Sequence, residues 1–190
     1  AAAVGACAER LARITGVVDV AGANVVAILT RAPSSGGKSR LFASLGRPPD
    51  PELLSALLLD TVEGVSTPEF LVAVVVTPAS ACTEVAALVG ASALIMPQEG
   101  GDLGASMREA MATLLAAGAR AVALVGSDLP VITLEPIRQA FSVLERDEDG
   151  VVLDDPAPGG ELAQERPIEL PAQPGGSWRI AWRVTHATCV

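Results

Sequence analysis

Aromatic residues are scarce in this chain, whose 190 residues include no Tyr, three Phe and two Trp. Half of the residues are nevertheless hydrophobic, so the core must consist mainly of Ala, Val and Leu. Small aliphatic side chains let helices pack close to a sheet, which favours parallel strands that are covered on both faces. The length is that of one domain, or of one domain with tails.

Cysteine and histidine are also rare. The three cysteines, Cys7, Cys82 and Cys189, lie far apart and show no Cys-x-x-Cys or Cys/His spacing. This pattern fits neither a disulfide framework nor a zinc site, and it favours a cytoplasmic protein. The one histidine, His186, lies in the C-terminal tail, and we expect it to be solvated.

Basic residues are outnumbered, because 13 Lys and Arg stand against 22 Asp and Glu, for a formal net charge of −9. Nucleic acids and anionic membranes both need a basic surface, so the charge argues against both as partners. No apolar run approaches the ~20 residues that cross a bilayer, and the first charges follow the N-terminal apolar stretch, unlike those of a signal peptide. We therefore expect a soluble protein in which a few cations bind phosphate locally.

Apolar runs alternate with helical periods along residues 24–153. Five runs without polar alternation are typical of buried strands, at 24–29, 71–76, 91–95, 121–126 and 150–153. Helical spacing covers 51–65, 80–89, 103–117 and 134–146. This alternation predicts an α/β fold of three layers, α/β/α, around a mostly parallel, doubly wound sheet. Ligands of such sheets bind beyond the carboxyl ends of the strands.

Two regions lie outside this alternation. Residues 1–23 form an N-terminal extension, with a short helix as its expected structure and no functional signature. The tail, residues 154–190, starts with an irregular stretch rich in Pro and Gly. Residues 178–184 then alternate apolar and polar side chains, which predicts a half-buried edge strand. An exposed edge can pair with a second copy, so a homo-oligomer is an open alternative.

The first strand leads into a loop that is rich in glycine and in cations. Gly36 and Gly37 let backbone N–H groups approach an anion, and Arg31, Lys38 and Arg40 supply three cations within ten residues. An acidic chain seldom concentrates cations in this way, so the loop predicts a phosphate site at the strand end. A solvated turn is the alternative.

Residues 32–39 also approximate the Walker A pattern GxxxxGK[ST], with Ala32 in place of the first Gly. A P-loop-type phosphotransferase is therefore a second hypothesis. It needs a long helix that begins at Lys38, whereas Gly46 and Pro48 leave little room for one.

The fourth strand ends in Gly126-Ser127-Asp128-Leu129-Pro130. An Asp at the carboxyl end of a strand, in a Pro-containing turn, is well placed to ligate Mg²⁺ or Mn²⁺ that bridges phosphates. Asp128 as a simple turn residue is the alternative.

A third segment, residues 98–108, leads from the third strand into a helix. Gly100, Gly101 and Gly104 give a bare backbone on which a base or ribose can pack closely. Asp102 as the N-cap of that helix is the structural alternative.

Together these segments resemble a bacterial family with a GT-A-type nucleotide-diphospho-sugar transferase fold and mostly unassigned substrates. Its relatives include phospholactate guanylyltransferase and the molybdenum-cofactor guanylyltransferase. The matching motifs are Ala32-Pro33, Lys38-Ser39-Arg40-Leu41, Asp60-Thr61, Gln98, Gly101-Asp102-Leu103-Gly104 and Gly126-Ser127-Asp128-Leu129-Pro130. The resemblance covers about residues 24–153. The sequence departs from the family after Leu153, where the family's Gly-Pro-Ala-x-Asp-Gly-Gly-Tyr-Tyr segment, which forms the acceptor side, has no counterpart.

The resemblance implies a metal-dependent nucleotidyltransferase or glycosyltransferase that acts on a nucleoside triphosphate or a nucleotide sugar. We expect the nucleotide to contact Arg31, Gly36, Gly37, Gln98, Gly101, Asp102 and Gly104. We expect the catalytic groups to be Lys38, Arg40 and Asp128, with Asp128 as the ligand of Mg²⁺ or Mn²⁺. The altered segment after Leu153 leaves a third hypothesis open, a nucleotide-binding module without catalysis.

Overall fold

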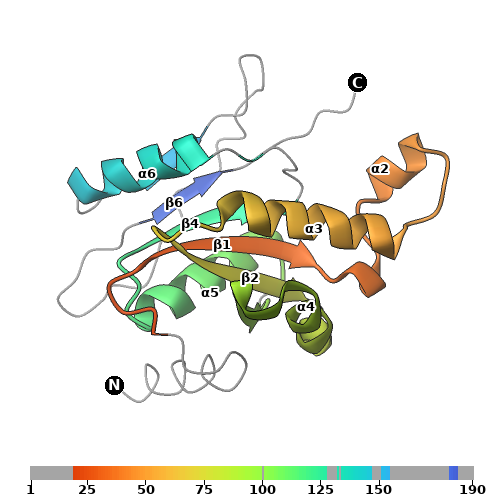
Figure 1. The fold of residues 1–190 in the computed structure, drawn as a ribbon, viewed down its shortest axis with the longest axis horizontal. Helices are drawn as coiled ribbons and strands as arrows, with labels where there is room; N and C mark the ends of the chain where they lie inside the picture. Colours follow the sequence, from red (N-terminus) through yellow and green to blue (C-terminus); the bar gives the residue numbers. More distant parts are fainter. Residues whose placement is uncertain are drawn as a thin grey trace.

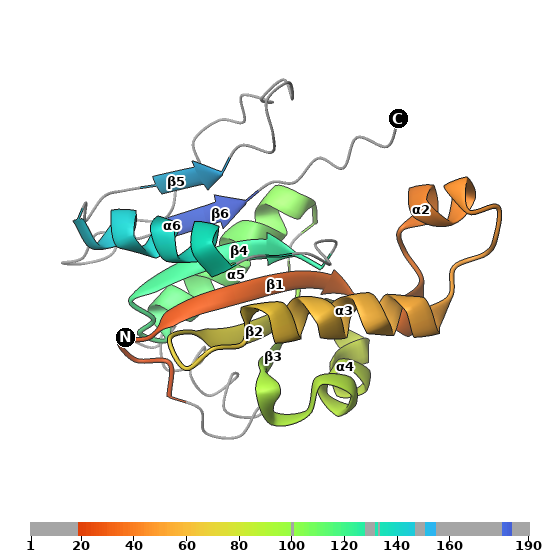
Figure 2. The same ribbon diagram turned by 45° about the horizontal axis from the view of Figure 1, so that its top comes forward.

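A computed structural model of the chain describes residues 19–99, 101–127, 132, 134–146, 151–154 and 180–183, with the backbone alone at 146 and in the last two ranges. Within this part of the chain, six parallel strands form one sheet in the order β3-β2-β1-β4-β6-β5 (Figures 1 and 2). The strands are β1 Asn24–Arg31, β2 Leu71–Thr77, β3 Leu94–Pro97, β4 Ala121–Gly126, β5 Val151–Asp154 and β6 Ile180–Arg183. The predicted parallel α/β architecture is confirmed.

Helices cover both faces of this sheet. They are α2 Ser39–Ser44, α3 Pro51–Val65, α4 Cys82–Val89, α5 Leu103–Ala116 and α6 Leu134–Arg146, with short 3-10 turns η1 Pro33–Ser35, η2 Ala79–Ala81 and η3 Gly90–Ser92. Side chains of α3, α4 and α6 pack on one face, and side chains of α5 pack on the other. The result is the three-layer α/β/α arrangement expected from the sequence.

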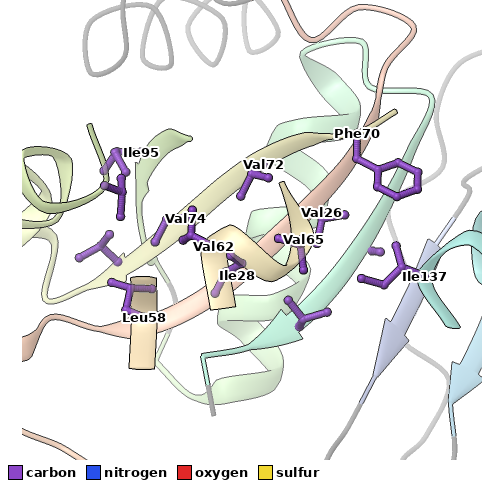
Figure 3. Close-up of a cluster of buried hydrophobic side chains, with 14 of the residues drawn as sticks. Val26, Ile28, Leu58, Val62, Val65, Phe70, Val72, Val74, Ile95 and Ile137 are labelled. Atoms are coloured by element: carbon purple, nitrogen blue, oxygen red, sulfur yellow. The ribbon is translucent and has the colours of Figure 1, made fainter. Parts of the chain in front are cut away.

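The strand residues supply the two halves of the core in alternation. Val26 and Ile28 of β1 join the cluster under α3 (Figure 3), whereas Val25 and Ala27 join the cluster under α5. Because successive side chains of a strand point to opposite faces, a strand that is covered twice must be apolar throughout. Leu58 of α3 is 1% exposed, and its truncation to Ala would cost about 2–5 kcal/mol.

The helix starts follow the predicted capping residues. Asp50 accepts hydrogen bonds from the backbone N–H groups of Glu52 and Leu53, with Pro51 in the first turn of α3. Asp102 accepts one from Ala105 N at 2.7 Å. A carboxylate at an N-cap satisfies N–H groups that the helix itself leaves without partners. The structural expectation for Asp102 is confirmed.

The strand predicted within residues 178–184 is present as β6, but its predicted place at the edge of the sheet is wrong. Strand β6 pairs in parallel with β4 on one side and with β5 on the other, so β5 lies at the edge of the sheet. Alternation of apolar and polar residues reports exposure, and it carries no information about which strands lie on either side. The tail therefore contributes a strand to the sheet of residues 24–153.

Strand β3 begins later than the sequence indicates, because Gly90–Ser92 form the turn η3.

No helix in the described part of the chain has the length and apolar character needed to cross a membrane. Cys82 is a free thiol, and Cys7, Cys189 and His186 lie outside the described residues. The cytoplasmic location stays a prediction.

Candidate functional site

A cleft of about 290 Å³ opens at the carboxyl ends of β1, β2, β3 and β4. Each of these strands contributes its last residues or the residue that follows. The lining residues are Leu29, Thr30, Arg31, Gly36, Gly37, Lys38, Leu54, Thr77, Gln98, Leu103 and Ser127. This is the end of the sheet where the sequence predicts a ligand.

The cleft also lies where the winding of the sheet reverses. From β1 the chain adds β2 and β3 on one side, and it then returns to place β4 on the other side of β1. Helix α3 after β1 and helix α5 before β4 therefore cover opposite faces, and the loops at the strand ends diverge. Parallel sheets bind ligands in the crevice that this divergence creates.

The loop after β1 has an unusual backbone. Gly36, Gly37 and Lys38 have φ values of 67°, 132° and 49° in succession. A Cβ on Gly37 would lie 3.1 Å from Cδ of Arg31, so glycine at this position lets the Arg31 side chain pack against the loop. The positive φ of Lys38 costs about 1–2 kcal/mol for a side-chain-bearing residue, and such strain tends to persist at functional sites.

Two contacts hold the first part of this loop in place. The backbone N–H of Ala32 donates to the carbonyl oxygen of Thr77 at 2.8 Å, which joins the ends of β1 and β2. Ser34 donates from its backbone N–H to Glu84 Oε1 of α4 at 2.9 Å, and its hydroxyl donates to the same carboxylate. The loop is thus anchored on the sheet and on α4 before it reaches the glycines.

Lys38 bridges the first and fourth strands. Its ammonium Nζ donates to the carbonyl oxygen of Ser127 at 3.3 Å, and Ser127 is the residue directly after β4. The side chain is half-buried, and this burial lowers the pKa of Lys38 from its ordinary value of 10.5. Arg31, the last residue of β1, is exposed at the same cleft. Two cations therefore face one space.

Neutral polar groups complete the base of the cleft. The Thr30 hydroxyl donates to the Arg31 carbonyl oxygen at 3.1 Å, and Thr30 is 5% exposed. The Ser127 N–H donates to the carbonyl oxygen of Leu29 at 3.2 Å, which continues the pairing of β1 with β4. A cleft lined by cations, hydroxyls and backbone groups suits an anion with many acceptor oxygens, such as a polyphosphate.

Gln98 forms the wall beside β3. Its backbone N–H donates to the Val76 carbonyl oxygen at 2.7 Å, and its side-chain Nε2 donates to Ser106 Oγ of α5 at 3.0 Å. Beside it, Leu103 is 66% exposed, although it lines the cleft. This end of the cleft offers one polar side chain and one apolar surface.

Five of the predicted site residues line the cleft, namely Arg31, Gly36, Gly37, Lys38 and Gln98. Four do not: Arg40, Gly101, Asp102 and Gly104 are absent from the lining. Arg40 is exposed on α2, which stands away from the sheet (Figure 2). Nothing lies within 4 Å of a Cβ placed on Gly101, and one on Gly104 would meet only Asp102, at 3.5 Å. Asp128 lies outside the described residues, directly after Ser127.

Six residues that line the cleft were not among the predicted site residues, namely Leu29, Thr30, Leu54, Thr77, Leu103 and Ser127. Ser127 had a signal in its motif, Gly126-Ser127-Asp128-Leu129-Pro130. Thr30 and Thr77 had an available signal. Each places a hydroxyl group at the carboxyl end of an otherwise apolar run, and these ends lie at the same edge of the sheet. Leu54 had none, because an apolar residue in a helix is normally assigned to the core. Leu103 had only its place in the motif Gly101-Asp102-Leu103-Gly104.

A divalent cation has less support from the described residues than a phosphate has. Within the described ranges, no group of three or more His, Cys, Asp or Glu side chains could hold a metal ion. The lining residues that the structure describes include no carboxylate, whereas Mg²⁺ and Mn²⁺ prefer carboxylate oxygens. The described lining fits an anion, and a metal there would depend on Asp128 and on the oxygens of the ligand.

The helix α2 bears on the P-loop hypothesis. It begins at Ser39, directly after Lys38, but it has only six residues and Lys38 makes no side-chain cap. A P-loop places phosphate at the N-terminus of a substantial helix with its dipole. Instead, the Lys38 ammonium is turned toward Ser127. The structure disfavours a Walker A site at residues 32–39.

The fold and cleft define a doubly wound α/β protein with a cleft at the carboxyl ends of its strands. The chain belongs to the bacterial family described as "Uncharacterized protein conserved in bacteria (DUF2064)", whose model matches residues 61–160, or 100 of its 190 residues. No curated protein matches the sequence significantly.

A solved structure shares the fold, and a second shows a weaker likeness. The first is from Desulfovibrio desulfuricans G20, and its assignment as a nucleotide-diphospho-sugar transferase is provisional. It has a TM-score of 0.60 and 22% identity over 70% of this chain, which spans 58% of that chain. A second, 4-diphosphocytidyl-2C-methyl-D-erythritol synthase, has a TM-score of 0.45 and 16% identity over 83% of this chain and 71% of its own. The first likeness establishes a GT-A-like fold, and the second is too weak to carry an argument.

Proposed function

We propose that this protein binds a nucleoside triphosphate or a nucleotide sugar in the cleft and transfers its nucleotidyl or glycosyl group to an acceptor. The observation that carries the proposal is the contact between Lys38 Nζ and the carbonyl oxygen of Ser127. It joins the cationic loop after β1 to the strand end that precedes Asp128. The resemblance of the motifs and the GT-A-like fold of a solved structure support the same class of reaction.

Both versions of the reaction need the same electrostatic help. In nucleotidyl transfer, an acceptor oxygen bonds to the α-phosphorus and pyrophosphate departs with the electrons of the broken P–O bond. In glycosyl transfer, the acceptor bonds to the anomeric carbon and a nucleoside diphosphate departs. Either leaving group gains negative charge as its bond lengthens. Arg31 and Lys38 face the cleft, where they would stabilise this charge.

The half-buried position of Lys38 increases this effect. A charge that is partly removed from water interacts more strongly with a ligand, because the surrounding dielectric constant is lower. The same burial lowers the pKa of Lys38, so the ammonium is less stable without an anion than an exposed lysine would be. A phosphate oxygen beside it would favour the protonated form.

We further propose a divalent metal, Mg²⁺ or Mn²⁺, with Asp128 as its protein ligand. When bound, such an ion neutralises charge on the phosphoryl oxygens. The support is the place of Asp128 in the sequence, one residue beyond a group that lines the cleft. Arg40 stays a proposed catalytic residue on the family motif alone, and Gly101, Asp102 and Gly104 stay proposed nucleotide contacts on the same basis.

Thermal unfolding in the presence of candidate ligands tests the proposal. The panel comprises the four nucleoside triphosphates and a set of nucleotide sugars, each with and without Mn²⁺. A ligand at a hundred times its Kd stabilises the protein by about 2.7 kcal/mol, which is readily measured. The absence of any stabilisation, with the protein folded, would contradict the proposal.

A non-catalytic nucleotide-binding module is the second candidate, since the family segment after Leu153 has no counterpart in this sequence. Turnover of a ligand found in the panel, abolished by D128A with the fold retained, would exclude it. Binding without turnover against a broad set of hydroxyl and phosphate acceptors would favour it.

A further inference from the structure

The buried hydroxyl of Ser106 has a fixed direction. Ser106 is 1% exposed in the first turns of α5, and its Oγ donates to the carbonyl oxygen of Asp102 at 2.8 Å. A serine hydroxyl has a single proton. Because that proton is used on Asp102, Ser106 Oγ can only accept a hydrogen bond on its other side.

This direction determines how the Gln98 amide is oriented. Ser106 Oγ can accept from the NH₂ end of Gln98 but cannot donate to its carbonyl end, so the contact at 3.0 Å involves Nε2. The backbone N–H of Gln98 is held separately by the Val76 carbonyl oxygen. Within the part of the chain that the structure describes, no group donates a hydrogen bond to Gln98 Oε1.

We propose that Ser106 is a positioning residue that turns the carbonyl oxygen of Gln98 toward the cleft, where it accepts a hydrogen bond from the nucleoside part of the substrate. The inference rests on the proposed function, because it assumes that the cleft holds a nucleotide. The donor on the ligand would be an N–H of the base or a hydroxyl of the ribose. Ser106 itself does not line the cleft, and it acts only through Gln98.

The charges of the cleft favour one orientation of a bound nucleotide. Arg31 and Lys38 attract phosphate oxygens beside β1 and β4, whereas a carbonyl oxygen beside β3 repels them. A nucleotide therefore has one favourable orientation, with the phosphates at the cations and the nucleoside at Gln98. Leu103, which is 66% exposed beside Gln98, offers an apolar surface to the base. Burying that surface adds to the preference for a nucleoside at this end.

Binding measurements on the full chain test the inference with two kinds of ligand. The four nucleoside triphosphates carry a nucleoside, and inorganic tripolyphosphate carries none. The ratio of the tripolyphosphate Kd to the nucleotide Kd isolates what the nucleoside contributes. The variants are Q98M, which removes the amide at similar volume, and S106A, which releases it. Ser66→Ala is the matched control, because Ser66 Oγ also donates to a carbonyl four residues earlier, that of Val62, but lies before β2 at the opposite end of the sheet.

We expect Q98M to lower the ratio for the preferred nucleotide by about two- to tenfold, the usual effect of one hydrogen bond, with the tripolyphosphate Kd unchanged. S106A lets the amide present either end, so it should also tighten binding of a nucleotide that the unmodified protein disfavours. General destabilisation would not tighten the binding of any ligand. S66A should leave all five Kd values unchanged.

The two possible failures are distinguishable. If the unmodified protein binds nucleotides but Q98M and S106A keep its ratio and order of preference, the inference is overturned and the proposed function stands. If S106A weakens all nucleotides equally without changing their order, Ser106 has a structural role only and the inference is also overturned. If the folded protein binds no nucleotide at all, the proposed function itself fails, and the inference fails with it.

Discussion

The ammonium nitrogen of Lys38 lies 3.3 Å from the carbonyl oxygen of Ser127 and donates a hydrogen bond to it. These residues are 89 positions apart in the sequence, and each follows a different strand of the sheet. Their contact closes the base of the cleft where the winding reverses. It brings the loop after β1 and the end of β4 together at one cleft.

The burial of Lys38 predicts opposite effects of pH on phosphate affinity and on stability. Only the ammonium form attracts a phosphate, so affinity for tripolyphosphate should fall as the pH rises through the lowered pKa of Lys38. In the window between this folded pKa and the ordinary value, the unfolded chain binds more protons. The free energy of unfolding of the ligand-free protein should therefore rise with pH in that window.

Titration of the Kd and of the ligand-free Tm between neutral pH and pH 10.5, the ordinary pKa of lysine, measures both effects. K38R is the control, because a guanidinium stays protonated over the whole range. Both slopes should disappear in K38R. Identical slopes in the two proteins would show that another group titrates.

Gly37→Ala should destabilise the protein and, as a separate effect, weaken phosphate binding. The φ of 132° is strained for any residue with a Cβ, which costs about 1–3 kcal/mol. The new methyl group would also lie 3.1 Å from Arg31 Cδ, so the guanidinium must move. Tripolyphosphate affinity and chemical denaturation measure the two consequences separately.

Gly46→Ala is the matched control for this prediction. Gly46 has a φ of 62°, so Ala is strained there too, by about 1–2 kcal/mol. Nothing lies within 4 Å of a Cβ at this position. G46A should therefore lose stability without losing affinity for tripolyphosphate. Equal losses of affinity in G37A and G46A would show that Arg31 has no part in binding.

Asp128→Asn should weaken the response to metal and leave metal-free nucleotide binding in place. The substitution keeps the shape of the side chain and removes its charge. A charged contact contributes about 1.5–3 kcal/mol, so the Mn²⁺ concentration needed for a half-maximal shift in Tm should rise about 10- to 100-fold. Asp50→Asn is the control, since Asn also serves as an N-cap and Asp50 does not line the cleft. An unchanged Mn²⁺ response in D128N would rule out this residue as the ligand.

Local signals in the sequence predicted most of the fold. The observed bounds of α3 and β4 agree with the predicted ones. Asp50 and Pro51 mark the start of a helix, and residues 121–126 form an apolar run with clear ends. The position of β6 could not be predicted. It depends on pairing between Val122 and Ile180, and local periodicity carries no information about such distant partners.

The cationic half of the cleft was predictable, whereas in the other half only Gln98 was predicted. Glycines and cations after a strand have a local chemical signature, so Arg31, Gly37 and Lys38 were identified correctly as neighbours of one space. Leu103 and the contact between Gln98 and Ser106 depend on how α5 packs beside β3. Packing of this kind is a property of the folded chain, and no single residue type signals it.

Gly64 of α3 and Ile132 should show energetic coupling. A Cβ on Gly64 would lie 2.8 Å from Cγ2 of Ile132, and Ile132 packs against the core cluster under α3. Ile132 belongs to the segment between β4 and α6 that also includes Asp128. Gly64→Ala alone gains about 1 kcal/mol of helix propensity but overpacks the contact by about 1–3 kcal/mol, so we expect a net loss of stability.

Ile132→Ala removes the methyl group that Gly64→Ala would strike. In the I132A background, G64A should therefore become neutral or stabilising, with a coupling energy of about 1–2 kcal/mol in a double-mutant cycle. Chemical denaturation of the four proteins measures this energy. Additive effects would mean that positions 64 and 132 do not interact.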